Sequence, residues 1–122
     1  MKVLIVDDSR ATRAILKRIL KPMGVTCVEA ADGQKGLDTL AENPDVALAL
    51  VDWNMPNMDG LQFIQAVRSD SNNDDVLLMM VTTESEIQRV SYAMDAGANE
   101  YIVKPFTQDI ISQKMRLMGL DV

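Results

Sequence analysis

Short, nearly apolar runs alternate along the chain with longer amphipathic segments, and this alternation limits the possible folds more than any other feature. A short run of apolar residues is typical of a strand that is buried on both faces of a sheet. The predicted strands span residues 2–6, 25–30, 46–51, 76–81 and 101–103. Apolar residues recur at helical spacing in the intervening and final segments, residues 10–21, 34–42, 61–68, 85–96 and 108–118. The alternation predicts an α/β fold: a doubly wound, five-stranded parallel sheet with five helices on its two faces.

Capping residues mark the start of two of the predicted helices. Ser9 precedes the helix at 10–21 and Thr107 precedes the helix at 108–118, and both residue types are common helix N-caps. No linker, repeat or low-complexity stretch interrupts the pattern. We therefore expect residues 1–122 to form a single domain.

Histidine is absent from the chain, and its absence excludes several kinds of chemistry. A Ser-His or Cys-His catalytic pair cannot form within the chain, nor can a histidine-ligated zinc site, so any bound metal must be a hard ion held by oxygen. The net charge of −6 argues against a nucleic-acid partner. No apolar run reaches the ~18 residues of a membrane span, and Asp7 and Asp8 interrupt the apolar start before it resembles a signal peptide. We expect a cytoplasmic protein that does not insert into a membrane.

Charged and hydroxyl side chains follow four of the five predicted strands. They are, in chain order, Asp7 with Asp8, Asp52, Thr82 and Lys104. An open α/β sheet binds its ligands beyond the carboxyl ends of the strands. Right-handed crossovers and the usual strand order 2-1-3-4-5 place the first and third strands side by side. Three carboxylates are therefore expected to converge on one small site.

Three neighbouring carboxylates repel one another, and a bound divalent cation removes that repulsion. A few oxygen ligands favour Mg²⁺, which keeps several waters and shares a phosphate group. Lys104 supplies a fixed positive charge at the same edge of the sheet, which suits a phosphate oxygen. Taken alone, Asp7 and Asp8 also fit a solvated turn at a helix start, where acidic residues are favoured. The whole set, with charged or hydroxyl residues after four of the five strands, indicates a site.

Five short motifs give the chain a resemblance to a known family. They are Val-Asp-Asp-Ser at 6–9, Val-Asp-Trp-Asn-Met-Pro at 51–56, Met-Asp-Gly at 58–60, Val-Thr at 81–82 and Lys-Pro-Phe at 104–106. In this order and near this spacing they resemble a response-regulator receiver domain, over essentially the whole chain. The likeness is greatest to the stand-alone receivers of bacterial chemotaxis.

The resemblance implies a role for each matching residue. Asp52 matches the phosphoryl acceptor. Asp7 and Asp8, together with Asp52 and the backbone carbonyl of Asn54, match the ligands of Mg²⁺, for which Mn²⁺ is an expected substitute. Lys104 matches the lysine that contacts the phosphoryl group.

Two further residues match the switch of the family. Thr82 matches the hydroxyl that moves onto the phosphoryl group, and Tyr101 matches the aromatic side chain that changes rotamer with it. The Lys104–Pro105 peptide bond is expected to be cis, which an X-Pro bond permits at low cost.

Other positions match residues that adjust the switch or transmit its signal. Asn54 and Glu84 match positions that tune dephosphorylation, and Thr83 stands where small residues are common, so we expect it to narrow access to Asp52. The expected output face includes Arg89, Tyr92, Tyr101 and Lys104.

The resemblance also implies what the chain does and with which partners. A single-domain response regulator takes its phosphoryl group from a histidine kinase or a phosphotransfer protein, and this chain has no histidine of its own to serve as donor. It then signals by conformational change to a downstream protein, for which chemotaxis and control of the flagellar motor switch fit best; a phosphatase is a further expected partner. Such a protein is a signalling switch rather than an enzyme, although it assists its own phosphotransfer and dephosphorylation.

Three alternatives remain open at this point. A magnesium-dependent phosphatase of the haloacid-dehalogenase type also forms an aspartyl-phosphate, but it carries an Asp-x-Asp pattern after its first strand, whereas Asp7 and Asp8 are adjacent. A flavodoxin-like electron carrier needs a phosphate-binding loop after the first strand, and no glycine-rich turn is present there. A degenerate receiver that acts only as a scaffold is disfavoured because the key residues are all present.

Overall fold

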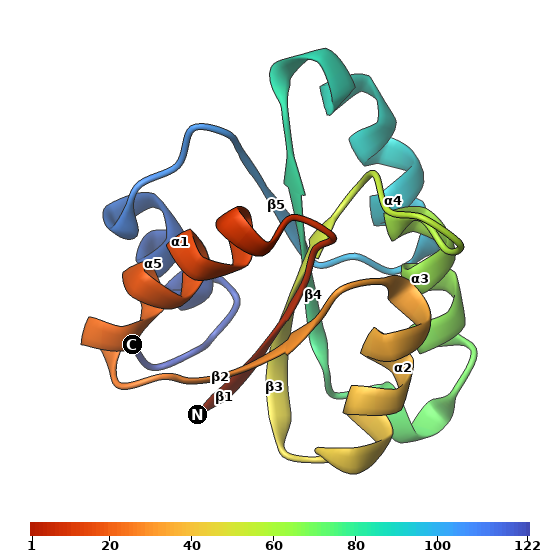
Figure 1. The fold of residues 1–122 in the computed structure, drawn as a ribbon, viewed down its shortest axis with the longest axis horizontal. Helices are drawn as coiled ribbons and strands as arrows, with labels where there is room; N and C mark the ends of the chain where they lie inside the picture. Colours follow the sequence, from red (N-terminus) through yellow and green to blue (C-terminus); the bar gives the residue numbers. More distant parts are fainter.

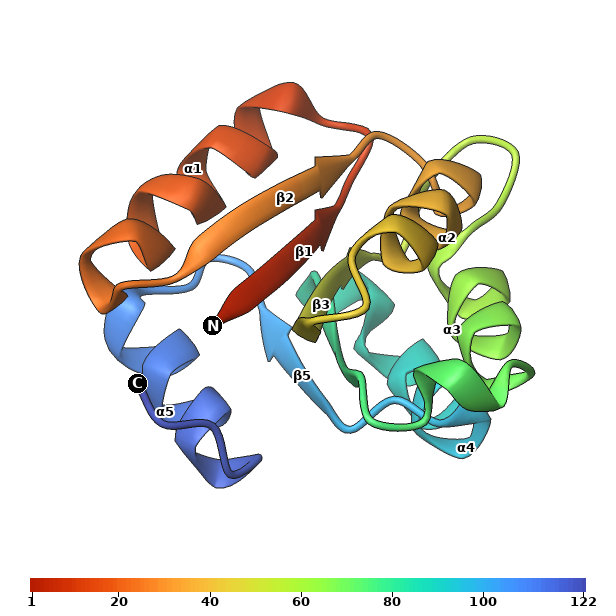
Figure 2. The same ribbon diagram turned by 90° about the horizontal axis from the view of Figure 1, so that it is seen from below.

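The computed structural model describes all residues, 1–122, and contains one parallel sheet with the strand order β2-β1-β3-β4-β5. Helices α1 and α5 cover one face of the sheet, and helices α2, α3 and α4 cover the other (Figures 1 and 2). The strands are β1 (Lys2–Val6), β2 (Thr26–Ala30), β3 (Val46–Asp52), β4 (Leu77–Thr82) and β5 (Glu100–Val103). The α-helices are α1 (Arg10–Leu20), α2 (Gly33–Glu42), α3 (Gly60–Arg68), α4 (Val90–Ala96) and α5 (Gln108–Leu117). The predicted fold class, strand order and number of helices are confirmed.

The central strands bury both of their faces, as their apolar sequences predict. Successive residues of a strand point to opposite faces, so Val3 and Ile5 of β1 pack under α1 and α5, whereas Leu4 and Val6 pack under α2 and α3. The edge strands differ. The residues of β2 are mostly exposed or half-buried, and among them is Glu29. The sheet therefore separates two apolar cores, one on each side.

The register of the strands brings their carboxyl ends to one edge of the sheet. Val6 pairs with Val51 across β1 and β3, and Thr82 pairs with Val103 across β4 and β5. Asp52, the last residue of β3, pairs with Val81. The polar residues that end or follow these strands therefore emerge side by side, as the topology predicts.

The expected helix caps are confirmed, but one expected helix is divided. The side chain of Ser9 accepts a hydrogen bond from the amide of Thr12, and that of Thr107 accepts one from the amide of Ile110. The prediction of one continuous helix over 85–96 is wrong, because a 3-10 helix, η3 (Glu84–Arg89), precedes the short α4. Thr83 before η3 does not cap a backbone amide; its hydroxyl bonds to side chains instead.

Two smaller 3-10 turns replace segments that were expected to be helical or irregular. Turn η1 (Lys21–Met23) follows α1 and ends at Gly24, whose φ of 75° is in the left-handed region that favours glycine. Turn η2 (Ser71–Asn73) lies in the loop that was expected between α3 and β4. No helix is both long and apolar enough to cross a bilayer.

Candidate functional site

Three carboxylates meet at the carboxyl edge of the sheet. Asp7 and Asp8 follow β1, and Asp52 ends the neighbouring strand β3. One carboxylate oxygen from each of them lies within 4.8 Å of the others. The structure therefore brings together the three acidic residues that the strand ends predicted.

Asp7 is the most buried of the three, with 2% of its surface exposed. Its Oδ1 accepts a 2.8 Å hydrogen bond from the amide of Ser9, and its backbone carbonyl accepts a 2.6 Å bond from Nη1 of Arg13. Its Oδ2 is also buried but has no hydrogen-bond partner in the protein. Burial raises the pKa of the Asp7 carboxyl, which the Ser9 amide opposes. A buried oxygen without a donor is costly unless a ligand completes its bonding.

Asp52 lies beside the ammonium group of Lys104. Its side chain is 12% exposed, and its Oδ1 lies 3.6 Å from Nζ of Lys104. Burial, followed by the negative charge of Asp7, raises the pKa of Asp52 from 3.8 to about 6, against the opposing effect of Lys104. Asp52 is thus mainly ionised at neutral pH, but its negative charge is poorly compensated.

These carboxylates fit a hard divalent cation. Oxygen donors from acidic side chains are what Mg²⁺ prefers, and Oδ2 of Asp7 is a buried acceptor that a cation would satisfy. A cation would also offset the two main causes of the raised pKa of Asp52, which are its burial and the repulsion by Asp7. The residues present therefore suit the metal that their chemistry predicts.

Thr82 and Lys104 lie at the ends of β4 and β5, next to Asp52. Thr82 ends β4 and is fully buried, and its hydroxyl donates a 3.3 Å bond to the carbonyl of Thr83. The amide of Lys104 donates a 2.7 Å bond to the carbonyl of Thr82, which joins the ends of β4 and β5. The Lys104–Pro105 bond is cis, as predicted.

Gly60 allows helix α3 to begin against the end of β3. A Cβ at this position would lie 2.5 Å from the carbonyl oxygen of Asp52 and 3.1 Å from Cα of Trp53. The amide of Gly60 donates a 2.9 Å bond to the carbonyl of Trp53. This close approach depends on the missing side chain of Gly60 and holds the end of β3 against α3.

The aromatic residues of the expected output face occupy different environments. Tyr92 on α4 is 64% exposed. Tyr101 on β5 is half-buried, and Nζ of Lys114 from α5 lies 5.2 Å from the centre of its ring. Arg89 at the end of η3 lies over the ring of Trp53, the residue after Asp52, with its guanidinium carbon 6.0 Å from the ring centre.

Two residues at the site were missed by reasoning from the sequence. Arg13 on α1 is half-buried and joins the carbonyl of Asp7 to the carboxylate of Glu29. Glu86 accepts hydrogen bonds from Asn54 and Thr83. The only sequence signal for either residue is its short distance along the chain from a site motif.

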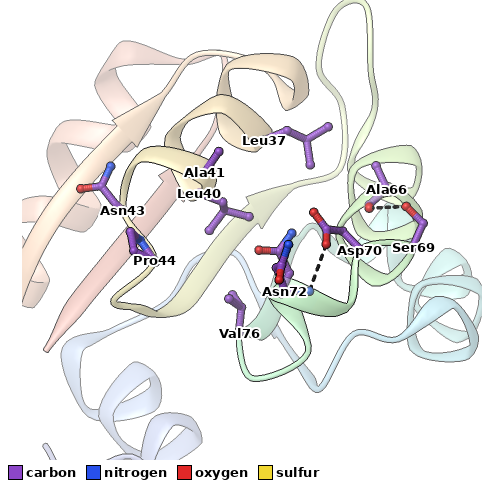
Figure 3. Close-up of a pocket in the computed structure, with 11 residues that line it drawn as sticks. Leu37, Leu40, Ala41, Asn43, Pro44, Ala66, Ser69, Asp70, Asn72 and Val76 are labelled. Carbon is purple, nitrogen blue, oxygen red and sulfur yellow. Dashed lines mark hydrogen bonds between the residues drawn. The ribbon is translucent and has the colours of Figure 1, made fainter.

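A separate pocket of about 660 Å³ lies at the opposite edge of the sheet (Figure 3). It is bounded by the C-terminal ends of α2 and α3 and by turn η2, and Pro44 and Val76 place it before β3 and β4. None of the predicted site residues lines it. The acidic cluster, and not this pocket, therefore carries the chemistry that the sequence indicates.

Comparisons with known proteins agree with this geometry. A family model described as the response regulator receiver domain matches residues 3–116. The chain is 43% identical over 116 residues to a chemotaxis protein CheY homolog of Campylobacter jejuni, covering 94% of this chain and 89% of that protein. It is 41% identical over 119 residues to chemotaxis protein CheY1 of Helicobacter pylori, covering 97% and 96%. The structure of chemotaxis protein CheY4 of Vibrio cholerae superposes with a TM-score of 0.87 at 31% identity, covering 95% of this chain and 96% of that one.

A doubly wound sheet with an acidic cluster and a lysine at its carboxyl edge defines the receiver class of signalling domains. The chain belongs to the response-regulator receiver family. Among the relatives named above, it is similar to stand-alone chemotaxis proteins over nearly its whole length.

Proposed function

We propose that the chain is a phosphorylation switch in which Asp52 accepts a phosphoryl group from a phosphohistidine of a partner kinase or phosphotransfer protein. Asp7, Asp8, Asp52 and the backbone carbonyl of Asn54 would hold Mg²⁺, or Mn²⁺ in its place. The observation that carries this proposal is the meeting of three carboxylates, one with an unpartnered buried oxygen, beside Lys104. The relatives are chemotaxis proteins, which supports a downstream target in flagellar motor control.

The transfer itself needs mainly positioning and charge stabilisation. A carboxylate oxygen of Asp52 forms a bond to phosphorus while the bond from phosphorus to the donor histidine nitrogen breaks. The Lys104 ammonium, already 3.6 Å from Asp52, stabilises a phosphoryl oxygen. When bound, Mg²⁺ supplies further neutralisation of the negative charge on the phosphoryl oxygens. The chain is then a switch that assists its own phosphorylation and dephosphorylation, and a separate phosphatase would act on it as a regulator.

The buried hydroxyl of Thr82 supports a mechanism for the switch. Its present bond to the carbonyl of Thr83 is long, at 3.3 Å, and a charged phosphoryl oxygen is a stronger acceptor. Thr82 turns toward the phosphoryl group, and Tyr101 follows into the space that it leaves. The surface that carries Tyr92, Tyr101, Arg89 and Lys104 then changes, and a cytoplasmic target protein recognises it.

Intact-mass measurement after incubation with acetyl phosphate and Mg²⁺ tests the proposal. Wild-type protein should gain about 80 Da, the mass of one phosphoryl group, because phosphoryl transfer requires only a placed carboxylate and charge neutralisation. Asp52→Asn and wild type with EDTA should gain nothing. Trp53, which is buried beside the acceptor, should report Mg²⁺ binding by fluorescence, and Asp7→Asn should abolish that response. If the wild-type chain gains no mass with acetyl phosphate or with a phosphorylated kinase, the site does not accept a phosphoryl group.

A further inference from the structure

Glu86 joins the segment that follows β3 to the segment that follows β4. Its Oε2 accepts a hydrogen bond from the side-chain amide of Asn54, and its Oε1 accepts a 3.0 Å bond from the hydroxyl of Thr83. Because the single hydroxyl hydrogen of Thr83 is used in this bond, the 2.9 Å contact with Ser85 has the Ser85 hydroxyl as donor. We call the three residues Asn54, Thr83 and Glu86 the Glu86 clasp.

The clasp spans the two strands next to the acceptor. Asn54 lies two residues after Asp52 at the end of β3, and Thr83 directly follows Thr82 at the end of β4. These strands are neighbours in the sheet, and Asp52 pairs with Val81. The side-chain bridge therefore connects the segments that directly follow Asp52 and Thr82 at the carboxyl edge of the sheet.

We propose that Glu86 is a positioning residue that holds Asn54 and Thr83 together and so slows the entry of phosphodonors and of water to Asp52. This inference rests on the proposed function of Asp52. A closed clasp lowers the rate at which a small donor phosphorylates Asp52, because the donor reaches it more slowly. It lowers the rate at which the aspartyl-phosphate is hydrolysed, because water also reaches it more slowly. The lifetime of the phosphorylated state then depends on a residue that touches neither the metal ligands' carboxylates nor the phosphoryl group.

Thr83 is expected to narrow access to Asp52, and the clasp offers a different reason for this effect from the size of the Thr83 side chain. Thr83 is half-buried, and its hydroxyl is held by Glu86 rather than free to turn away. Thr83→Val keeps the branched shape but removes the hydroxyl, so it separates the two explanations. If the clasp controls access, Thr83→Val accelerates both reactions; if bulk alone controls access, only Thr83→Ala does.

The test compares Glu86→Ala with Glu86→Gln in two measurements. The first is amide hydrogen exchange of residues 54–58 and 83–89 in protein without metal or donor. The second is the rate of phosphorylation by acetyl phosphate and of subsequent loss of the group, followed by intact mass. The amide introduced by Glu86→Gln keeps one acceptor for Asn54 and a polar partner for Thr83 while it removes the charge. Asp95→Ala, an exposed acid on α4, is the control for removing one negative charge.

Glu86→Ala should increase exchange in both segments and raise both rates by roughly three- to tenfold, the effect of losing one or two hydrogen bonds. Glu86→Gln and Asp95→Ala should behave like the wild type, and adding Thr83→Val to Glu86→Ala should have little further effect. If the wild type is phosphorylated, and Glu86→Ala gains and loses the phosphoryl group at the same rates as the wild type, the inference is overturned. Fast rates in Glu86→Gln would overturn it too, because charge and not the clasp would then be responsible. A wild type that gains no mass overturns the proposed function, and this inference with it.

Discussion

At the scale of single residues, Asp52 carries an unfavourable charge in the folded protein. Burial raises the pKa of Asp52 to about 6, whereas in the unfolded chain it has its ordinary value of 3.8. The folded state therefore holds the proton more tightly, and ionised Asp52 opposes folding. This opposition develops as the pH rises above the unfolded value and is complete above the folded value, at about 2–3 kcal/mol.

We therefore predict that Asp52→Asn makes the metal-free protein more stable at pH 8, by about 2 kcal/mol, because the amide has no charge to bury. The gain should shrink as the pH falls through 6 toward 4, where folded Asp52 is already protonated. Urea unfolding of both proteins in EDTA at pH 5 and pH 8 measures the difference. A gain in stability that does not depend on pH would contradict the raised pKa as its cause.

At the scale of the elements, Arg68 ties the end of α3 to two other segments. Its guanidinium donates to the carbonyls of Gly97, Asn73 and Val76, at 2.9, 3.0 and 2.7 Å, and to the side chain of Asn99. Helix α3, turn η2 and the connection from α4 to β5 thus share one donor group. Its planar fork matches acceptors in several directions at once.

Arg68→Ala should lower the free energy of unfolding by about 2–4 kcal/mol, because several carbonyls lose their donor. Arg68→Lys should recover only part of the loss, since one ammonium cannot reach all of these acceptors. Arg18→Ala, an exposed arginine on α1, is the control and should change the stability by less than about 0.5 kcal/mol. Urea unfolding measures all three, and a loss in Arg68→Ala no larger than the control would contradict this account.

Elements with a clear apolar pattern could be predicted from the sequence. Features that depend on side-chain hydrogen bonds could not. The five strands and five α-helices were predicted in the right order, because buried strands and amphipathic helices have distinct apolar patterns. The division of residues 85–96 depends on where the hydroxyl of Thr83 bonds, which no pattern records. Likewise, Asp7 and Asp52 follow from topology, whereas the long side chains of Arg13 and Glu86 reach partners that only the folded chain brings near.

At the scale of the whole molecule, the sheet connects Asp52 on β3, through β4, to β5. Thr82 at the end of β4 pairs with Val103 of β5, and its carbonyl receives the amide of Lys104. Tyr101 lies two residues earlier on β5, beneath Lys114 of α5. A movement of Thr82 would therefore occur next to β5, the strand that carries Tyr101.

We predict that Thr82→Ala still takes up the phosphoryl group but loses the response of that surface. In the wild type, phosphorylation should change the hydrogen exchange of residues 90–103, because Thr82 bonds to the new phosphoryl oxygens and Tyr101 follows. In Thr82→Ala the mass gain should persist while the change in exchange falls to less than half, since a methyl group offers no donor. Thr82→Ser keeps the hydroxyl and should keep the response. An equal response in Thr82→Ala would mean that the signal leaves the acceptor by another path, with Lys104 as the remaining link between Asp52 and β5.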